Sequence, residues 1–182
     1  TKTIEVLIID GLSKDNTNEE IEALKKTYPN IKLIINHQKH IPHALNIGIR
    51  EAKGEIIIRA DAHCSYSYNY ISNLVGALKA GVADVVGGSW EIKPRTNTRV
   101  SAAIAYMYSS DMGAGGKSYR SYKPQKPYLT DILPYGCFYK SLIKKIGGYD
   151  ERLLRSEDVE LWKRFKNNNY KLAIIPNTYI NY

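Results

Sequence analysis

The sequence feature that most constrains the fold is a short run of β-branched residues that ends in polar side chains. Ile56, Ile57 and Ile58 follow one another, and Asp61 and His63 come soon after them. A continuous β-branched run suits a strand buried on both faces, as in a parallel α/β sheet. Because ligands bind at the carboxyl ends of strands in open α/β sheets, the run predicts a binding site at Asp61 and His63.

The spacing of Asp61 and His63 adds a chemical prediction. Alternate residues of a strand share a face, so we expect both side chains to point the same way. A carboxylate and an imidazole can bind a divalent cation and leave coordination positions for phosphate oxygens. The structural alternative is that Asp61 caps a turn and His63 is an ordinary loop histidine. The triplet alone does not decide between the two.

Length and composition narrow the class of protein. The 182 residues, 43% of them hydrophobic, suit one globular domain. No apolar run approaches the roughly 18 residues that cross a bilayer. Cys64 and Cys137 fit no metal-binding spacing and predict reduced thiols in the cytoplasm.

The net charge of +8 and the pI near 9.3 predict an anionic partner. Nucleotide phosphates, anionic lipid headgroups and nucleic acid would all satisfy such a charge. The sequence has no arginine-rich run or RNA-binding signature, so we expect no nucleic-acid partner.

Hydrophobic periodicity predicts alternating strands and helices over the first half of the chain. The expected strands cover residues 4–10, 31–35, 56–58, a part of 83–92, 132–139, 172–175 and 178–182. The expected helices cover 18–28, 40–53, 69–80, 100–108, a short segment ending at 146 and one beginning near 156. Asn16 or Thr17 is expected to cap the first helix. This alternation predicts an α/β fold with a parallel, doubly wound sheet.

The second half holds a helix and a long irregular segment. Residues 100–108 predict a helix whose apolar face is formed by Val100, Ala103, Ile104 and Met107. Residues 109–130 are rich in Gly, Ser, Lys, Tyr and Pro, which predicts a mobile loop over a site.

Acidic residues recur at strand ends and helix starts. Asp10 ends the first expected strand, and we expect it beside Asp61 because parallel strand ends face one crevice. Its carboxylate can accept a hydrogen bond from a nucleotide base or ribose; its alternative role is that of an Asx-turn residue. Glu157 and Asp158 open the last helix, where the helix dipole alone would favour acids.

Four motifs in this order resemble glycosyltransferase family 2. They are D-G-x-S-x-D-x-T from Asp10, A-x-N-x-G-I-x-x-A-x-G-E from Ala44, the strand followed by D-x-H, and G-G-Y-D-E from Gly147 followed by E-D. The resemblance covers nearly the whole chain. The D-G-L-S and R-A-D-A-H forms look most like the branch that builds bacterial exopolysaccharides such as succinoglycan.

The resemblance implies the GT-A (nucleotide-diphospho-sugar transferase) fold, here with a mostly parallel sheet lacking the usual first strand and helix. It implies an inverting transfer of a sugar from a nucleotide-diphosphate donor, a UDP-sugar for preference, in polysaccharide biosynthesis. The acceptor would be a hydroxyl of a saccharide or lipid-linked saccharide. A divalent cation, Mn²⁺ or Mg²⁺, is the implied cofactor.

The resemblance also assigns roles to residues of this sequence. Asp158 matches the general base, and Glu157 is its neighbour. Asp61 matches the first acid of a D-x-D metal motif, with His63 in the place of the last acid. Gly136 matches a small residue on the acceptor side. The implied donor-nucleotide residues are Asp10, Gly11, Ser13, Asp15, Asn46, Arg59 and Asp61.

The resemblance further predicts how the chain is organised. Residues 1–182 would form a single catalytic domain, truncated at its N-terminus and open to truncation at its C-terminus, with a nucleotide-sugar half (1–92) and an acceptor half (93–182). The positive charge allows contact with an anionic membrane, so a cytoplasmic location, at the inner face of the plasma membrane, is expected. Two other functions fit the sequence: a non-catalytic nucleotide- or carbohydrate-binding module, and a nucleotidyltransferase.

Overall fold

The computed structural model describes residues 4–113, 119–121 and 123–181. The contacts among these residues divide the chain into two compact units, which lie within residues 1–57 with 140–161 and within residues 58–139 with 162–182. This division does not coincide with the expected halves 1–92 and 93–182. The assignment of those halves to donor and acceptor stays a prediction.

The first unit begins with a β-α-β-α sequence, as predicted. Its elements are β1 (Val6–Asp10), α1 (Thr17–Thr27), β2 (Ile31–Ile35) and α2 (Ile41–Glu51). Strands β1 and β2 are parallel, with Val6 opposite Ile31 and Asp10 opposite Ile35. Gly48 lets α2 lie close to β1, since a Cβ there would be 3.7 Å from the side chain of Ile9.

The start of α1 differs from the prediction. Thr17 is the first helical residue, and its amide and hydroxyl donate to Asp15 Oδ1 at 3.2 and 2.5 Å. Asn16 holds the cap position but donates its side-chain amide to Glu20 at 2.7 Å instead of accepting from the helix. Asn16 therefore occupies the predicted cap position, but its side chain does not cap the helix, and the Asx turn at Asp15 accepts the amide and hydroxyl of Thr17 instead.

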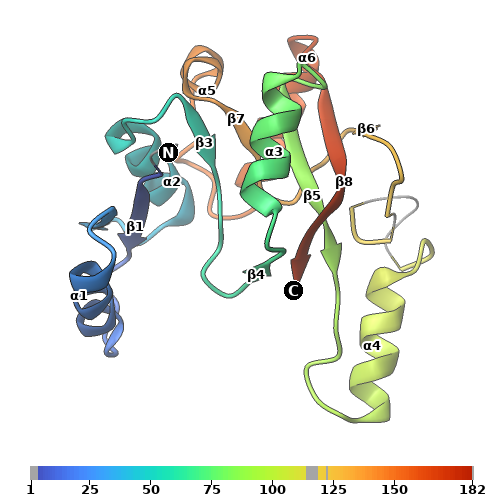
Figure 1. Cartoon of the computed structure of the whole chain (residues 1–182), viewed down its shortest axis with the longest axis horizontal. Helices are drawn as coiled ribbons and strands as arrows, with labels where there is room; N and C mark the ends of the chain where they lie inside the picture. The colour runs from blue at the N-terminus through green and yellow to red at the C-terminus, as the bar shows by residue number, and fades with distance from the viewer. Residues whose placement is uncertain (1–3, 114–118, 122, 182) are drawn as a thin grey trace. The chain divides into compact units, whose positions relative to one another are not determined.

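The second unit contains a mixed sheet. Its strands are ordered β7-β5-β8-β4, and β6 pairs separately with β8. The strands are β4 (Ser65–Tyr66), β5 (Val85–Glu91), β6 (Tyr128–Thr130), β7 (Cys137–Tyr139) and β8 (Leu172–Asn181). Strands β5 and β8 run parallel and side by side (Figure 1), whereas β4, β6 and β7 are antiparallel to their partners.

The α/β class is thus confirmed, but the sheet is not mostly parallel. The antiparallel strands are two or three residues long, too short to give a periodic signal, and β4 follows a turn rather than a crossover helix. The two strands expected over residues 172–175 and 178–182 are a single strand to Asn181 with a bulge opposite Gly87 and Ser89, and Tyr182 lies outside the described residues.

Two glycines of the second unit are required by packing. A Cβ at Gly88 would lie 2.6 Å from the carbonyl oxygen of Thr178, and one at Gly136 would lie 2.7 Å from the Trp162 ring. Trp162 is fully buried and donates its indole N–H to the Leu133 carbonyl at 2.9 Å. The glycines therefore allow β5 to approach β8 and the residue before β7 to approach the core.

Strand β3 (Ile56–Ile58) ends the strand order of this sheet. The amide of Arg59, directly after β3, donates to the Gly136 carbonyl at 3.0 Å, directly before β7. The three isoleucines are half-buried, so the prediction that both faces are buried is wrong. Their β-branched run reflects strand propensity at a sheet edge rather than complete burial.

The remaining helices are α3 (Tyr70–Lys79), α4 (Arg99–Ser109), α5 (Lys140–Ile146) and α6 (Glu157–Asn167). All four were predicted to within a few residues. Strand β6 lies at the end of the expected loop 109–130, of which residues 114–118 and 122 are outside the described residues. Among the helices that the structure describes, none has the length and apolar character that a membrane span requires.

Candidate functional site

The carboxylate of Asp10 is fixed by its own loop. Asp10 ends β1 and is only 5% exposed, and its carbonyl accepts from the amide of Asn36 at 2.7 Å. The amide and the hydroxyl of Ser13 donate to its two carboxylate oxygens at 3.0 and 2.5 Å. This is the Asx-turn arrangement that the sequence left open as an alternative.

The Asp10 carboxylate keeps capacity for a ligand. The hydroxyl of Ser13 is the main cause of a lowered pKa of Asp10, and burial opposes it. An ionised carboxylate offers about four acceptor positions, of which Ser13 occupies two and the amide of Leu12 a third. Asp10 can therefore accept a further hydrogen bond from a neutral donor such as a base N–H or a ribose hydroxyl.

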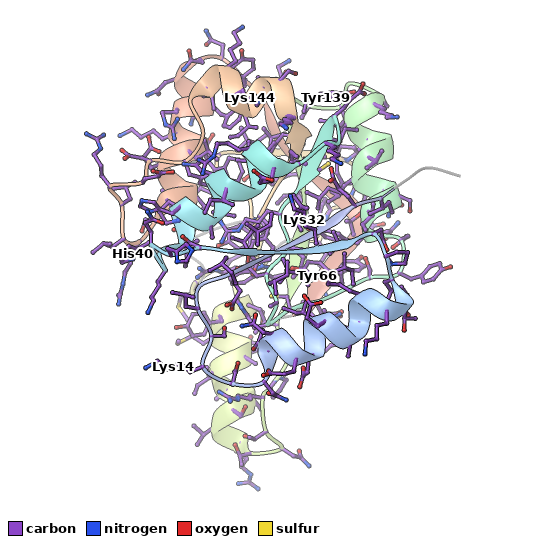
Figure 2. All side chains as sticks on the ribbon, turned by 90° about the vertical axis from the view of Figure 1, so that its left-hand side faces the viewer. Lys14, Lys32, His40, Tyr66, Tyr139 and Lys144 are labelled. Atoms are coloured by element: carbon purple, nitrogen blue, oxygen red, sulfur yellow. The ribbon has the colours of Figure 1, made fainter. Side chains whose placement is uncertain are left out.

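The rest of the loop faces outward. Leu12 has a φ of 65°, and Lys14 extends away from the loop (Figure 2). The pKa of Asp15 is lowered, chiefly by the hydroxyl of Thr17, so its carboxylate serves the start of α1. A Cβ at Gly11 would make only ordinary contacts, at 3.7 Å from Lys39. The donor-binding roles of Gly11, Ser13 and Asp15 stay predictions.

Asn46 has a structural role that the sequence analysis missed. Its side-chain N–H groups donate to the Tyr149 carbonyl at 2.8 Å and to Glu151 Oε1 at 2.9 Å, and its oxygen accepts from the Tyr149 amide at 2.9 Å. Gly148 has a φ of 71°, and a Cβ there would be 2.7 Å from Asn46 Oδ1. Asn46 thus ties α2 to the G-G-Y-D-E turn. Both motifs were visible in the sequence, but they lie about a hundred residues apart.

Asp61 lies in a turn and not on a strand. Strand β3 ends at Ile58, and the amide of Cys64 donates to the Asp61 carbonyl at 3.2 Å. The argument that Asp61 and His63 share a strand face is therefore wrong, because the chain leaves the strand before reaching them. They belong to the same turn, which still brings a carboxylate and an imidazole into one short segment.

The Asp61 carboxylate is held by Arg59. Its two oxygens accept from the guanidinium at 3.1 and 3.4 Å, and the two side chains are 24% and 9% exposed. The guanidinium lies 5.2 Å from the centre of the Tyr135 ring. The hydroxyl of Tyr66, labelled in Figure 2, accepts from the Asp61 amide at 2.7 Å and donates to its carbonyl at 3.2 Å. Backbone and carboxylate of Asp61 are both fixed.

The phenols around this turn have raised pKa values. Burial raises the pKa of Tyr66 to about 12 and also raises the pKa of Tyr135, whose hydroxyl is 3.2 Å from Cys64 Sγ. Both phenols are therefore neutral near pH 7, and the ion pair at this turn joins Arg59 and Asp61. Sequence reasoning missed the tyrosines because their contacts arise only in the folded chain.

The residues of the turn fit a divalent cation that brings its own phosphate ligands. No group of three or more His, Cys, Asp or Glu side chains that could hold a metal occurs among the described residues. Asp61 and His63 would supply two ligands, and Mg²⁺ or Mn²⁺ completes its sphere with phosphate and water oxygens. A cation on Asp61 would share the carboxylate with Arg59 or displace it.

Glu157 and Asp158 open α6, as predicted. Glu157 is buried, and Asp158 is half-buried with its Oδ1 accepting from the Val159 amide at 2.8 Å. Both belong to the first unit together with Asp10, whereas Arg59, Asp61, His63 and Gly136 belong to the second. The convergence of Asp61 with Asp10 and Asp158 therefore stays a prediction.

Solved glycosyltransferase structures share this fold. GalNAc-T7 with UDP, GalNAc and Mn²⁺ matches with a TM-score of 0.74 at 17% identity, over 98% of this chain and 37% of that chain. Staphylococcus aureus TarS 1–349 in complex with UDP matches with a TM-score of 0.68 at 15% identity, over 98% of this chain and 51% of that one. The fold is that of the GT-A class of nucleotide-sugar transferases.

The sequence places the chain within that class. The family profile described as glycosyl transferase family 2 matches residues 1–146, and the chain belongs to that family. The succinoglycan biosynthesis protein ExoA of Rhizobium meliloti is 28% identical over 176 residues, covering 95% of this chain and 52% of ExoA. Glycosyltransferase AglE of Haloferax volcanii is 30% identical over 171 residues, covering 93% and 53%.

A third relative comes from Methanococcus voltae: the dolichyl N-acetyl-alpha-D-glucosaminyl phosphate 3-beta-D-2,3-diacetamido-2,3-dideoxy-beta-D-glucuronosyltransferase. It is 25% identical over 190 residues, covering 98% of this chain and 56% of the relative. The chain thus spans about half the length of these curated relatives. The family resemblance predicted from the motifs is confirmed.

Proposed function

We propose that this domain transfers a sugar, with inversion, from a nucleotide-diphosphate donor to an acceptor hydroxyl in polysaccharide biosynthesis. The observation that carries the proposal is the family match over residues 1–146, which includes the Asp10 loop and the Asp61 turn. The exopolysaccharide relative ExoA supports the same kind of pathway.

The donor is a UDP-sugar, bound through the Asp10 loop. Asp10 is ionised and oriented by Ser13, which suits it to accept from a base N–H or a ribose hydroxyl. Gly11 and Asp15 complete the loop, and Asn46 is a further donor-binding residue of the proposal. The fold relatives crystallised with UDP and with UDP-GlcNAc support this choice of donor.

The Asp61 turn receives the diphosphate. Asp61 and His63 would hold a divalent cation, and the imidazole favours Mn²⁺ over Mg²⁺. Such a cation neutralises the negative charge that develops on the leaving diphosphate. Arg59, which already pairs with Asp61, supplies a further positive charge at the same turn. The Mn²⁺ bound with UDP in GalNAc-T7 supports a cation-assisted donor site.

Asp158 accepts the proton of the attacking hydroxyl. A carboxylate within about 2.6–3.2 Å of that hydroxyl can take its proton as the new glycosidic bond forms. Attack from the face opposite the leaving diphosphate inverts the anomeric centre and needs one base. Glu157, buried in the same helix turn, is the neighbour of Asp158 rather than a second base.

The acceptor is a saccharide or lipid-linked saccharide, with Gly136 on the acceptor side. The Methanococcus voltae relative carries a dolichyl phosphate sugar in its name, which supports a lipid-linked acceptor. With a net charge of +8, the domain also contacts an anionic membrane, at the cytoplasmic face of the plasma membrane.

Incubating the full-length protein with labelled UDP-sugars, Mn²⁺ and membrane lipid extract tests the proposal. We expect one donor to be consumed and its label to enter an acceptor, with the opposite anomeric configuration by NMR. A protein that binds UDP-sugars but neither hydrolyses nor transfers any of them would instead be a non-catalytic binding module.

A further inference from the structure

Helix α4 turns its large apolar residues away from the protein. Val100, Ile104 and Met107, spaced at i, i+4 and i+7, share one helix face and are 70%, 51% and 50% exposed. The side that packs inward carries small residues instead: Ala105 is buried, and Ser101 and Ser109, four residues on either side, are half-buried. A helix that only covered a core would have the reverse orientation.

The exposed apolar surface continues around and beyond the helix. Tyr106 and Tyr108 are 77% and 46% exposed, and Met112, just after α4, is 91% exposed. Figure 1 shows α4 set apart from the sheet of its own unit, and Figure 2 shows side chains spread around it. A group of exposed large apolar residues on one helix is typical of an interaction site.

The same surface carries net positive charge. Residues 92–113 contain Lys93, Arg95 and Arg99 against one acid, Asp111, a net charge of +2. Arg95 precedes α4 and Arg99 is its first residue, and both are exposed. Apolar and basic side chains therefore occur together on and beside one helix.

An aromatic cluster fixes the end of this helix to the sheet. The guanidinium of Arg120 lies 5.2 Å from the Trp90 ring centre, 5.5 Å from that of Tyr119 and 6.0 Å from that of Tyr108 on α4. The amide of Trp90, in β5, donates to the Tyr119 carbonyl at 2.7 Å. Trp and Tyr are the residues enriched at the headgroup level of a membrane.

We propose that α4 with its flanking residues 92–98 and 110–113 is a docking surface for an anionic lipid bilayer, with Val100, Ile104 and Met107 inserted among the acyl chains. Amphipathic helices bind bilayers by combining apolar insertion with attraction between basic residues and anionic headgroups. The proposal deepens the membrane contact of the proposed function by naming the surface, and it does not depend on sugar transfer.

Charge argues against the other occupants. In a symmetric dimer through this face, each surface with its net charge of +2 would oppose its own copy, which is repulsive. An acidic peptide or a nucleic acid would use the basic residues but leave the apolar face exposed. An anionic bilayer pairs with the basic residues through its headgroups and covers the apolar face with its acyl chains.

Vesicle flotation of the 182-residue chain tests the proposal. We expect binding to vesicles of equal parts phosphatidylcholine and phosphatidylglycerol, and little binding to phosphatidylcholine alone. The variant Val100→Ser/Ile104→Ser/Met107→Ser should bind the anionic vesicles at least about tenfold more weakly. The matched control is Leu24→Ser/Ile71→Ser, two apolar residues of similar exposure on α1 and α3, which should bind as the parent chain does.

A second pair of variants tests the charge. Arg95→Gln/Arg99→Gln should lower vesicle affinity about tenfold or more at low salt, and Lys26→Gln/Lys79→Gln, exposed on α1 and α3, should lower it less. Circular dichroism verifies that each variant is folded.

The proposal fails if the α4 triple variant floats as well as the parent chain, or if the parent chain ignores anionic vesicles. Sedimentation that shows self-association lost in the triple variant, without vesicle binding, would assign the face to a second copy. Sugar transfer to a water-soluble acceptor, measured separately, distinguishes loss of docking from failure of the proposed function.

Discussion

The Asp10 loop and the Asp61 turn hold their carboxylates in opposite ways. Asp10 is held by Ser13, a neutral donor three residues away, so its negative charge is not cancelled locally. Asp61 is held by the guanidinium of Arg59, so its charge is already balanced. The first arrangement suits the neutral N–H and O–H donors of a nucleoside. The second suits a diphosphate with its cation, because the cation can pair with Asp61 while the phosphates pair with Arg59.

The largest expected effect lies outside both loops. If Asp10 and Asp61 serve donor binding, Asp158→Asn should lower kcat by about 10²–10⁴-fold and leave UDP affinity unchanged. Single-turnover transfer and isothermal titration measure the two quantities. Glu160→Gln, in the same helix, is the matched control. Near-normal turnover of Asp158→Asn would remove this residue from the role of base.

The second-largest expected effect concerns the cation, which distinguishes the role of Asp61 from that of Asp10. Asp61→Asn should reduce the gain in UDP affinity that Mn²⁺ produces by about tenfold or more, because one of two protein ligands is weakened. Asp10→Asn should lower UDP affinity with and without Mn²⁺ alike. Asp131→Asn, exposed in the same unit as Asp61, controls for loss of a charge. An unchanged Mn²⁺ effect in Asp61→Asn would refute the metal role.

The G-G-Y-D-E turn, which Asn46 binds, is fixed in a third way: through the positive φ of Gly148. Gly148→Ala should lower the free energy of unfolding by about 1–3 kcal/mol, since φ is 71° and the new Cβ would meet Asn46 Oδ1. Urea denaturation measures it. Gly76→Ala, where a Cβ meets nothing within 4 Å, should be neutral or stabilising. Equal effects at both positions would contradict the contact.

The smallest effect concerns the pH dependence of the Asp10 loop. The pKa of Asp10 is lowered in the folded chain, so its stabilisation is present above the ordinary carboxyl pKa of 3.8 and is lost as pH falls through the lowered value. Ser13→Ala should cost roughly 1 kcal/mol near neutral pH. The cost should shrink in acid, as urea midpoints at the two pH values would show. A cost independent of pH would mean that Ser13 acts by packing alone.

Much of the fold was predictable because the information was local. The helices α1, α2 and α3 and the strands β1 and β2 carry clear periodicity and end at Pro, Gly or polar residues. The strands β4, β6 and β7 are too short to produce a pattern and exist only through pairing with distant partners. The mixed sheet could therefore not be deduced from alternation along the chain.

The contacts of the candidate sites were likewise predictable where they are local in the sequence, and not where they join distant segments. The hydrogen bonds of Asp10 with Ser13 lie within one loop, and the sequence offered that alternative. The ring of Tyr135 beside Arg59 comes from a segment 76 residues away, and no spacing rule relates the two. The apolar face of α4 was visible in the sequence, but periodicity does not tell whether a face meets a core or the outside. Val100, Ile104 and Met107 face outward.

The position of β8 in the sheet has a consequence for folding. Residues 172–181 pair with strands that begin at residues 65, 85 and 128, so the ribosome must release nearly the whole of this sequence before the sheet can close. Earlier in translation, β5 exposes an unsatisfied edge, which favours recruitment of chaperones. We expect slow, late assembly of this unit, because its contacts span so much chain.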